Sequence, residues 1–238
     1  MMVSWGHVLL AGAWGGIVAL ERKAFLQAML SRPLVAATVM GLLLGDVESG
    51  LKVGMLLELF HLGAANLGAS LPENDTLSAT GTAAAAAAMA EATGAGSTEA
   101  LWSVAILLFI ALGRLGRQAD RKLEGYSTRL AAKARSIAEE GDVNRAVRQN
   151  LWGMWPHLVV YGLATASCAL AGYALGPLLD GLPLGVARGL AWSYPAMASV
   201  AAAIAARGSH ARRAAFWASL GALTVALGWT ALRLRGDA

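Results

Sequence analysis

The chain has 238 residues, of which 57% are hydrophobic and only 14% are charged, and its mean hydropathy is +0.55. Soluble domains usually carry about 25% charged residues, so this composition argues against a water-soluble domain and indicates a membrane protein. The formal net charge is only +4 and the basic residues gather in loops between apolar segments, a pattern that the positive-inside bias explains better than nucleic-acid binding does.

Apolar segments recur along the whole chain. A helix needs about 20 mostly apolar residues to cross the hydrocarbon core of a bilayer. The clearest candidates are Val3–Leu20, Leu101–Leu115, Leu151–Leu175, Pro183–Ala206 and Ala214–Leu232, and shorter or alanine-rich pieces are Leu34–Leu44, Leu51–Leu67 and Leu77–Ala92. The sequence therefore predicts an all-α, polytopic transmembrane protein with roughly seven to nine membrane segments, re-entrant hairpins being allowed among them.

The segment Gly45–Gly50 places charged residues between two short apolar pieces. A charge at the bilayer centre costs roughly 2.5–3.5 kcal/mol, so intramembrane ionisable residues usually face a bundle interior or a polar cavity. Short, glycine-interrupted apolar segments also mark broken helices around the binding sites of transporters. This segment, with Asp46 in it, is either a tight loop outside the membrane or the tip of a re-entrant hairpin, and the sequence leaves both open.

Glu58 is the leading candidate for a solute site, because it stands in an otherwise apolar run. Its carboxylate can accept hydrogen bonds from sugar hydroxyls, or bind a proton or a cation. The alternative is a structural carboxylate that backbone amides or a neighbouring tryptophan satisfy, and function is favoured because such groups in membranes are functional by default. His61 follows at helical spacing, but a carboxylate-bridged metal site needs a second such pair, so no metal site is expected.

A polar loop follows and ends in helix-start residues. It contains Asn66, Glu73 and Asn74, and the order Asn74, Asp75, Thr76 is typical of the beginning of a helix. The loop is either a solvated turn or a lining of the substrate path, and the two interpretations are about equally favoured.

The long polar stretch divides the chain into an N-terminal membrane region (1–115), a linker helix (116–150) and a C-terminal membrane region (151–238). Apolar residues of the linker recur at helical spacing among many charges, which predicts an amphipathic helix in the cytoplasm or at the membrane interface. It is interpreted as a solvated link, with a docking surface for a soluble partner as the alternative. Its arginines and lysines, with those of residues 22–32 and 207–213, place all three loops on the cytoplasmic side.

Catalytic signatures are absent from the sequence. There is no Gly-x-Ser-x-Gly motif, the histidines are scattered, and no phosphate-cradling glycine loop ends in Lys–Ser/Thr. The chain is therefore not expected to be an enzyme on its own or to hold a cofactor, although a membrane enzyme assembled from distant residues stays an alternative.

Several spaced motifs in the first third of the chain occur together. They are Gln27, Arg32–Pro33, Gly41–Asp46, Gly50–Leu51, Gly54, Glu58–Leu59, Leu62–Gly63 and Gly81–Thr82. This pattern resembles the membrane subunit IIC of the mannose/sorbose family of bacterial sugar phosphotransferase systems (PTS). The register fits from about Ser4 to Ala88, and beyond it the similarity is general.

The resemblance implies a multi-pass permease subunit of the bacterial inner membrane. In the family, IIC pairs with a second membrane subunit, IID, to carry a hexose-type sugar, and cytoplasmic IIB, fed by IIA, phosphorylates it. A homo-oligomer of the IIC/IID unit is also expected. By the same resemblance, the residues around the sugar path are Gln27, Asp46, Glu58, Asn66, Glu73 and Asn74. The alternative is a divergent regulatory or scaffolding subunit that passes no sugar.

Overall fold

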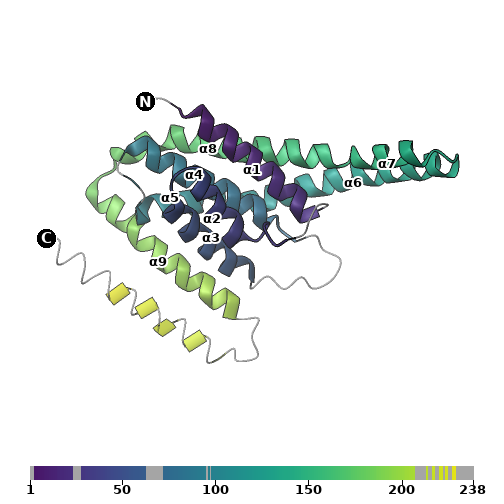
Figure 1. Ribbon diagram of the computed structural model, residues 1–238. Coiled ribbons are helices and arrows are strands. Elements are labelled where there is room, and N and C mark those ends of the chain that lie inside the picture. The colour runs from purple at the N-terminus through teal and green to yellow at the C-terminus, as the bar shows by residue number, and fades with distance from the viewer. Residues whose placement is uncertain are drawn as a thin grey trace.

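The computed structural model describes residues 3–23, 28–62, 72–94, 96, 98–206 and, near the C-terminus, 213, 216, 217, 220, 221, 223, 224, 227 and 228. Within this part all regular structure is helical, which confirms the predicted all-α class (Figure 1). The helices are α1 (Trp5–Lys23), α2 (Pro33–Leu43), α3 (Val47–Leu62), α4 (Asp75–Thr93), α5 (Glu99–Phe109), α6 (Leu112–Glu139), α7 (Val143–Leu151), α8 (Met154–Asp180) and α9 (Leu184–Ala206).

Three helical runs of the described chain are both long enough and apolar enough to cross a membrane. They are Glu99–Glu139, Val143–Asp180 and Leu184–Ala206. The apolar helix α2 has 11 residues. At 1.5 Å per residue it is about 16 Å long, roughly half of a 30 Å hydrocarbon core. The structure thus describes a multi-pass membrane protein, while the number of seven to nine segments stays a prediction; most of Ala214–Leu232 lies outside the described residues.

The long polar stretch is where structure and sequence prediction differ most. The one amphipathic helix predicted for 116–150 is two helices, α6 and α7, which pack against each other. The chain turns at Glu140–Asp142, because Gly141 takes a left-handed conformation (φ 90°) and the Asp142 side chain accepts a hydrogen bond from the Arg145 amide to begin α7. Together with the start of α8, these helices form an arm that projects from the other helices (Figure 1).

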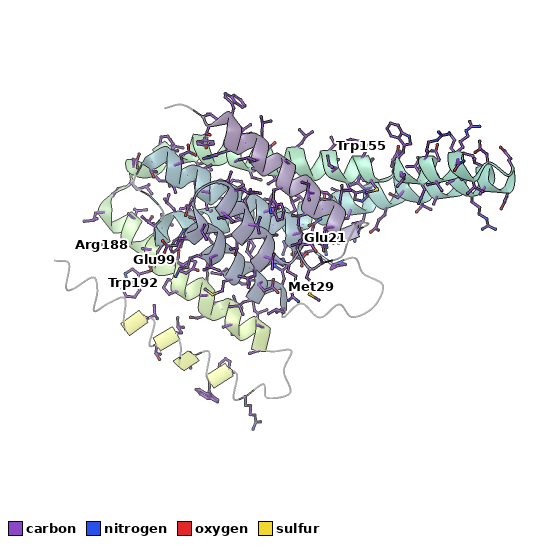
Figure 2. The ribbon with its side chains drawn as sticks, viewed as in Figure 1. Glu21, Met29, Glu99, Trp155, Arg188 and Trp192 are labelled. Atoms are coloured by element: carbon purple, nitrogen blue, oxygen red, sulfur yellow. The ribbon has the colours of Figure 1, made fainter. Side chains whose placement is uncertain are left out.

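The surface of this arm carries large apolar side chains. Val143 and Val147 are exposed along α7, and Trp152 and Trp155 follow at the junction with α8. Figure 2 marks Trp155 on the arm, outside the packed helices. Exposed aromatic side chains of this kind are typical of membrane interfaces and of contacts with other proteins.

The core is built around α4. Every residue from Thr76 to Ala90 is buried, and α1, α2, α3, α5, α6 and α8 all contact this helix. The alanines let neighbouring backbones approach closely, as small residues do in membrane helix packing. The approach is closest at Gly172 of α8, where an added Cβ would lie 2.4 Å from the Ala85 carbonyl oxygen.

α2 and α3 form a tight helical hairpin beside α4. At Gly50 an added Cβ would lie 2.4 Å from the Ala37 carbonyl oxygen, so only glycine fits this crossing. The chain reverses at Leu44–Asp46, where Gly45 has a φ of 76° and Asp46 Oδ1 accepts a hydrogen bond from the Ser49 amide. The indole N–H of Trp102 on α5 donates to Ser49 Oγ on α3 at 2.8 Å. This bond fixes the α2–α3 hairpin to α5.

We predict that Gly172→Ala destabilises the protein, because the methyl group meets backbone atoms of α4 that cannot move aside. The matched control is Gly125→Ala on the exposed face of α6, where an added Cβ meets nothing within 4 Å. That change should leave stability unchanged or raise it by up to about 1 kcal/mol. Thermal unfolding of both variants in detergent, followed by size-exclusion chromatography, provides the measurement, and equal midpoints would contradict this packing.

Candidate functional site

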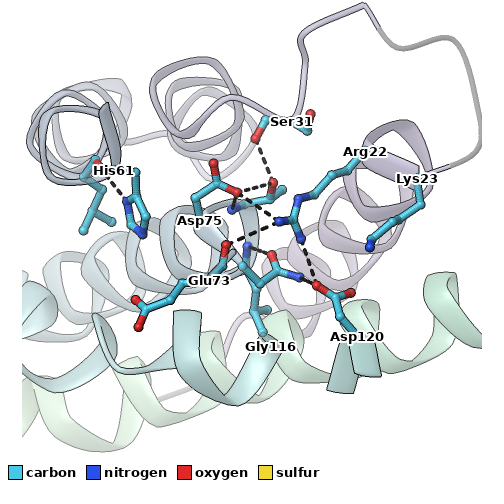
Figure 3. A network of polar contacts seen from close by, with 12 residues as sticks. Arg22, Lys23, Ser31, His61, Glu73, Asp75, Gly116 and Asp120 are labelled. Carbon is cyan, nitrogen blue, oxygen red and sulfur yellow. Dashed lines mark hydrogen bonds and ion pairs between the residues drawn. The ribbon is translucent and has the colours of Figure 1, made fainter. Parts of the chain in front are cut away.

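Three of the sequence-predicted site residues gather at one end of the helical core, where α1 and α3 end and α4 and α6 begin. Figure 3 shows part of this end, with Arg22, Glu73 and Asp120 labelled. Glu58, Glu73 and Asn74 lie here, surrounded by arginines and aspartates that sequence reasoning did not select. We call this group the polar end; it consists of Arg22, Arg32, Glu58, Glu73, Asn74, Asp75 and Asp120.

Glu58 joins the end of α3 to the beginning of α2. Its Oε1 accepts a hydrogen bond from Arg32 Nε at 2.9 Å and also contacts Arg32 Nη2, while its Oε2 accepts from the Leu34 amide at 3.2 Å. The carboxylate therefore neutralises Arg32 and satisfies one of the free amides at a helix N-terminus. Its side chain is 13% exposed and that of Arg32 is 46% exposed, so the pair lies at the surface of the polar end.

Asn74 and Asp120 form the buried part of the polar end. Asn74 Oδ1 accepts from the Leu77 amide at 2.9 Å and begins α4, and its Nδ2 donates to Asp120 Oδ2 at 3.1 Å. The same Asp120 oxygen accepts from Arg22 Nη1 at 3.1 Å, and Asp120 Oδ1 lies 2.5 Å from the Tyr161 hydroxyl. Asn74 and Asp120 are each only 2% exposed. One carboxylate thus holds α1, α6, α8 and the start of α4 together.

A second set of contacts fixes the short segment before α2. The amide of Ser31 donates to Glu21 Oε2 at 2.9 Å, and the Ser31 carbonyl accepts from Thr76 Oγ1 at 2.8 Å. Glu21 is 3% exposed, although it is a charged residue at the end of an apolar helix. The backbone that carries Arg32 is thereby anchored to both α1 and α4.

Glu73 and Asp75 are more exposed. Glu73 Oε1 accepts from Arg114 Nε at 3.2 Å, and the side chains are 38% and 75% exposed. Asp75 Oδ1 lies 3.5 Å from Arg22 Nη2. A surface pair such as Glu73–Arg114 contributes little to stability, so the Glu73 carboxylate is available to other partners at small cost.

Asp46 lies away from the polar end. It precedes α3, whereas Glu58 stands in the last turns of the same helix. Twelve residues of helix correspond to about 18 Å, so Asp46 and Glu58 lie near opposite ends of α3. Their roles along the sugar path stay a prediction. Gln27 and Asn66, the other two predicted residues, lie outside the described residues.

Sequence reasoning missed Arg22, Asp120 and Tyr161. Asp120 stands in a stretch dense with charges, where it looks like any solvated residue, and Tyr161 stands in an apolar span. No group of three or more histidines, cysteines, aspartates or glutamates placed to hold a metal occurs in the described part of the chain.

The family follows from a match along almost the whole chain. Residues 5–231 match the family model described as the sorbose-specific IIC component of the PTS. This chain belongs to that family. It is a IIC membrane component of the mannose/sorbose type, which confirms the resemblance drawn from Gln27 to Thr82.

Individual relatives match this IIC component over shorter stretches. The sorbose-specific EIIC component of Lacticaseibacillus casei is 34% identical over 80 residues, which are 34% of this chain and 28% of that protein. The sorbose-specific EIIC component of Klebsiella pneumoniae is 48% identical over 46 residues, or 19% of this chain and 17% of that protein. These matches span less than a third of the relatives' length.

A solved structure shares the fold. A chain in the cryo-EM structure of the mannose transporter ManYZ with microcin E492 is similar over 100% of this chain and 94% of that chain, with a TM-score of 0.59 and 21% identity. The likeness extends the fold assignment beyond the first third of the sequence.

We predict that Asp120→Asn strongly destabilises this IIC component, because it removes the closer and more deeply buried of the two carboxylates beside Arg22 and leaves only the more exposed Asp75 at 3.5 Å. Breaking a buried pair costs roughly 3–5 kcal/mol. The matched control is Glu124→Gln on the same helix. It removes the exposed pair of Glu124 with Lys23, whose side chains are 42% and 28% exposed, and should cost about 1 kcal/mol or less. Thermal unfolding in detergent compares the two, and similar midpoints would contradict the role of Asp120.

Proposed function

We propose that this chain is the permease subunit of a mannose/sorbose-type PTS, which translocates a hexose-type sugar across the bacterial inner membrane together with a IID subunit. The observation that carries the proposal is the family match over residues 5–231. The proposal assigns phosphoryl transfer to the cytoplasmic IIA and IIB proteins, so that this subunit itself catalyses no reaction.

The polar end is the part of the described chain best suited to receive the sugar. Glu58 presents a carboxylate acceptor, and Arg32 beside it presents guanidinium donors. A sugar hydroxyl both donates and accepts, so a neighbouring acceptor and donor match it. Because the two charges cancel, a neutral sugar can replace part of the Arg32–Glu58 contact without leaving an isolated charge.

Orientation supports the same assignment. The polar end adjoins the start of α6. The arm formed by α6 and α7 carries most of the arginines of the segment 116–150, which was predicted as a linker. By the positive-inside rule this side faces the cytoplasm. A sugar released from the polar end would meet IIB there, and phosphorylation would prevent its return.

We predict that Glu58→Gln abolishes sugar uptake without loss of membrane insertion, because the amide cannot replace the charged acceptor opposite Arg32. Uptake of radiolabelled mannose and sorbose into vesicles that contain this chain and its IID partner is the measurement. Glu48→Gln, an exposed change on the same helix, is the control and should leave uptake unchanged. Wild-type uptake by Glu58→Gln would refute the site.

A double variant separates ligand binding from ion pairing. If Glu58 serves only to neutralise Arg32, then Arg32→Gln combined with Glu58→Gln removes both charges and restores uptake. If Glu58 contacts the sugar, the double variant stays inactive although it folds. The amount of membrane-inserted protein and its thermal stability are measured in parallel. These measurements exclude loss of protein as the cause of lost uptake.

The IID subunit is the second part of the proposal. Uptake should require co-expression of this chain with IID, and the two should purify together, as a homo-oligomer of the IIC/IID unit. The competing function is a regulatory or scaffolding subunit. It predicts co-purification with IID but no uptake of any hexose, so the same vesicles decide between the two functions.

A further inference from the structure

A second polar site lies at the opposite end of the helical core from the polar end. A cavity of about 540 Å³ opens between the start of α1, the tip of the α2–α3 hairpin and the end of α4. This volume falls within the roughly 300–1,000 Å³ of small-molecule sites. The residues that give it its chemistry are His7, Asp46, Glu91 and the glycines Gly45, Gly94 and Gly96. We call it the hairpin-tip cavity.

The accessible side chains of the hairpin-tip cavity are mainly hydrogen-bond acceptors. His7 Nδ1 lies 2.8 Å from Glu91 Oε2, and the Tyr173 hydroxyl donates to the same oxygen. In the tautomer that carries its proton on Nδ1, facing the carboxylate, Nε2 of the ring is free to accept a hydrogen bond. The other Glu91 oxygen is an acceptor too. The side chains of His7 and Glu91 are 31% and 41% exposed, so both are within reach of a ligand.

Charge narrows the class of ligand. Asp46 and Glu91 bring two carboxylates to the cavity, and its described lining contains no lysine or arginine. Phosphates and carboxylates are therefore repelled. A metal ion is not favoured, because no set of three suitable ligands occurs in the described chain. The class of ligand that remains is a small molecule rich in hydrogen-bond donors.

Two further features indicate that acceptors in the cavity lack hydrogen-bond donors, which a ligand can supply. Asp46 Oδ2 is buried and has no hydrogen-bond partner, and a buried unpaired acceptor is costly. Gly45, Gly94 and Gly96 all have positive φ, and an added Cβ at any of them meets nothing within 4 Å. Their backbone is thus uncovered, and a ligand can approach it closely.

We propose that the hairpin-tip cavity is an outer sugar site, where the hydroxyls of a neutral hexose donate to Glu91, His7 and Asp46 before the sugar moves to the polar end. The identification of the ligand as a sugar rests on the proposed function. The acidic lining adds a selectivity that the polar end lacks: the cavity accepts the free sugar and rejects its phosphate.

A labelling experiment tests the site without requiring transport. Ala90 lines the cavity, whereas the native cysteine, Cys168, is buried on α8 and is not part of the cavity lining, so the wild-type protein is a suitable blank. The Ala90→Cys variant, purified with IID and placed in nanodiscs, is treated with a neutral, water-soluble thiol reagent. A panel of neutral hexoses, including mannose and sorbose, should slow labelling by the mass-action factor 1 + [L]/Kd, and mannose 6-phosphate should not.

Second-site variants test whether the hexose that slows labelling is bound in the hairpin-tip cavity. Glu91→Gln and His7→Gln, each combined with Ala90→Cys, should weaken protection by the hexose. Glu58→Gln should leave it intact, and so should Glu99→Gln, an exposed control at the same end of the core. The proposal is overturned if Ala90→Cys is not labelled, if no hexose protects, if protection disappears with Glu58→Gln alone, or if only a cationic sugar such as glucosamine protects.

The experiment also separates this inference from the permease assignment. Protection without uptake would support the hairpin-tip cavity and refute transport by this subunit. Uptake without protection would support transport and refute the outer site.

Discussion

The contact between Arg22 and Asp120 is the interaction on which the arrangement of this molecule depends most. Both charges are largely withdrawn from solvent, with side chains 17% and 3% exposed. Burial of an ion pair is tolerated only when further hydrogen bonds satisfy its remaining atoms. Here Asn74 and Tyr161 supply those bonds to Asp120, and the Glu73 carbonyl accepts one from Arg22. The pair therefore sets the relative positions of α1, α4, α6 and α8.

This constraint reaches the candidate sugar site through the backbone. Asn74 begins α4, and Thr76 in its first turn binds the Ser31 carbonyl next to Arg32. Arg32 in turn meets Glu58 at the end of α3. The exposed Arg32–Glu58 pair is thus supported by a buried network, which is how a binding group is held in position by neighbours that never contact the ligand.

Helix α3 connects the two polar sites of the core. Glu58 stands near its end and Asp46 immediately before its start, and α2 and α3 pack closely against each other at glycines while both contact α4. At the polar end the charges of Arg32 and Glu58 cancel. At the hairpin tip the carboxylates of Asp46 and Glu91 have only His7 as a basic neighbour in the described lining. The two ends therefore differ in charge: the hairpin tip is acidic, whereas the charges at the polar end are balanced.

The sequence by itself determined the features that depend on local composition and spacing. Hydropathy and small-residue content predicted a helical membrane protein, the spaced motifs from Gln27 to Thr82 identified the family, and Asn74 marked the start of α4. Only the tertiary structure decided the pairing of charges and the position of the cavity. Asp120, Tyr161 and Glu21 carry no local signal, because each acquires its role from partners far away in the chain. The separation of Asp46 from Glu58 follows from the continuous helix between them, and the hairpin-tip cavity exists only where α1, α4 and the hairpin meet.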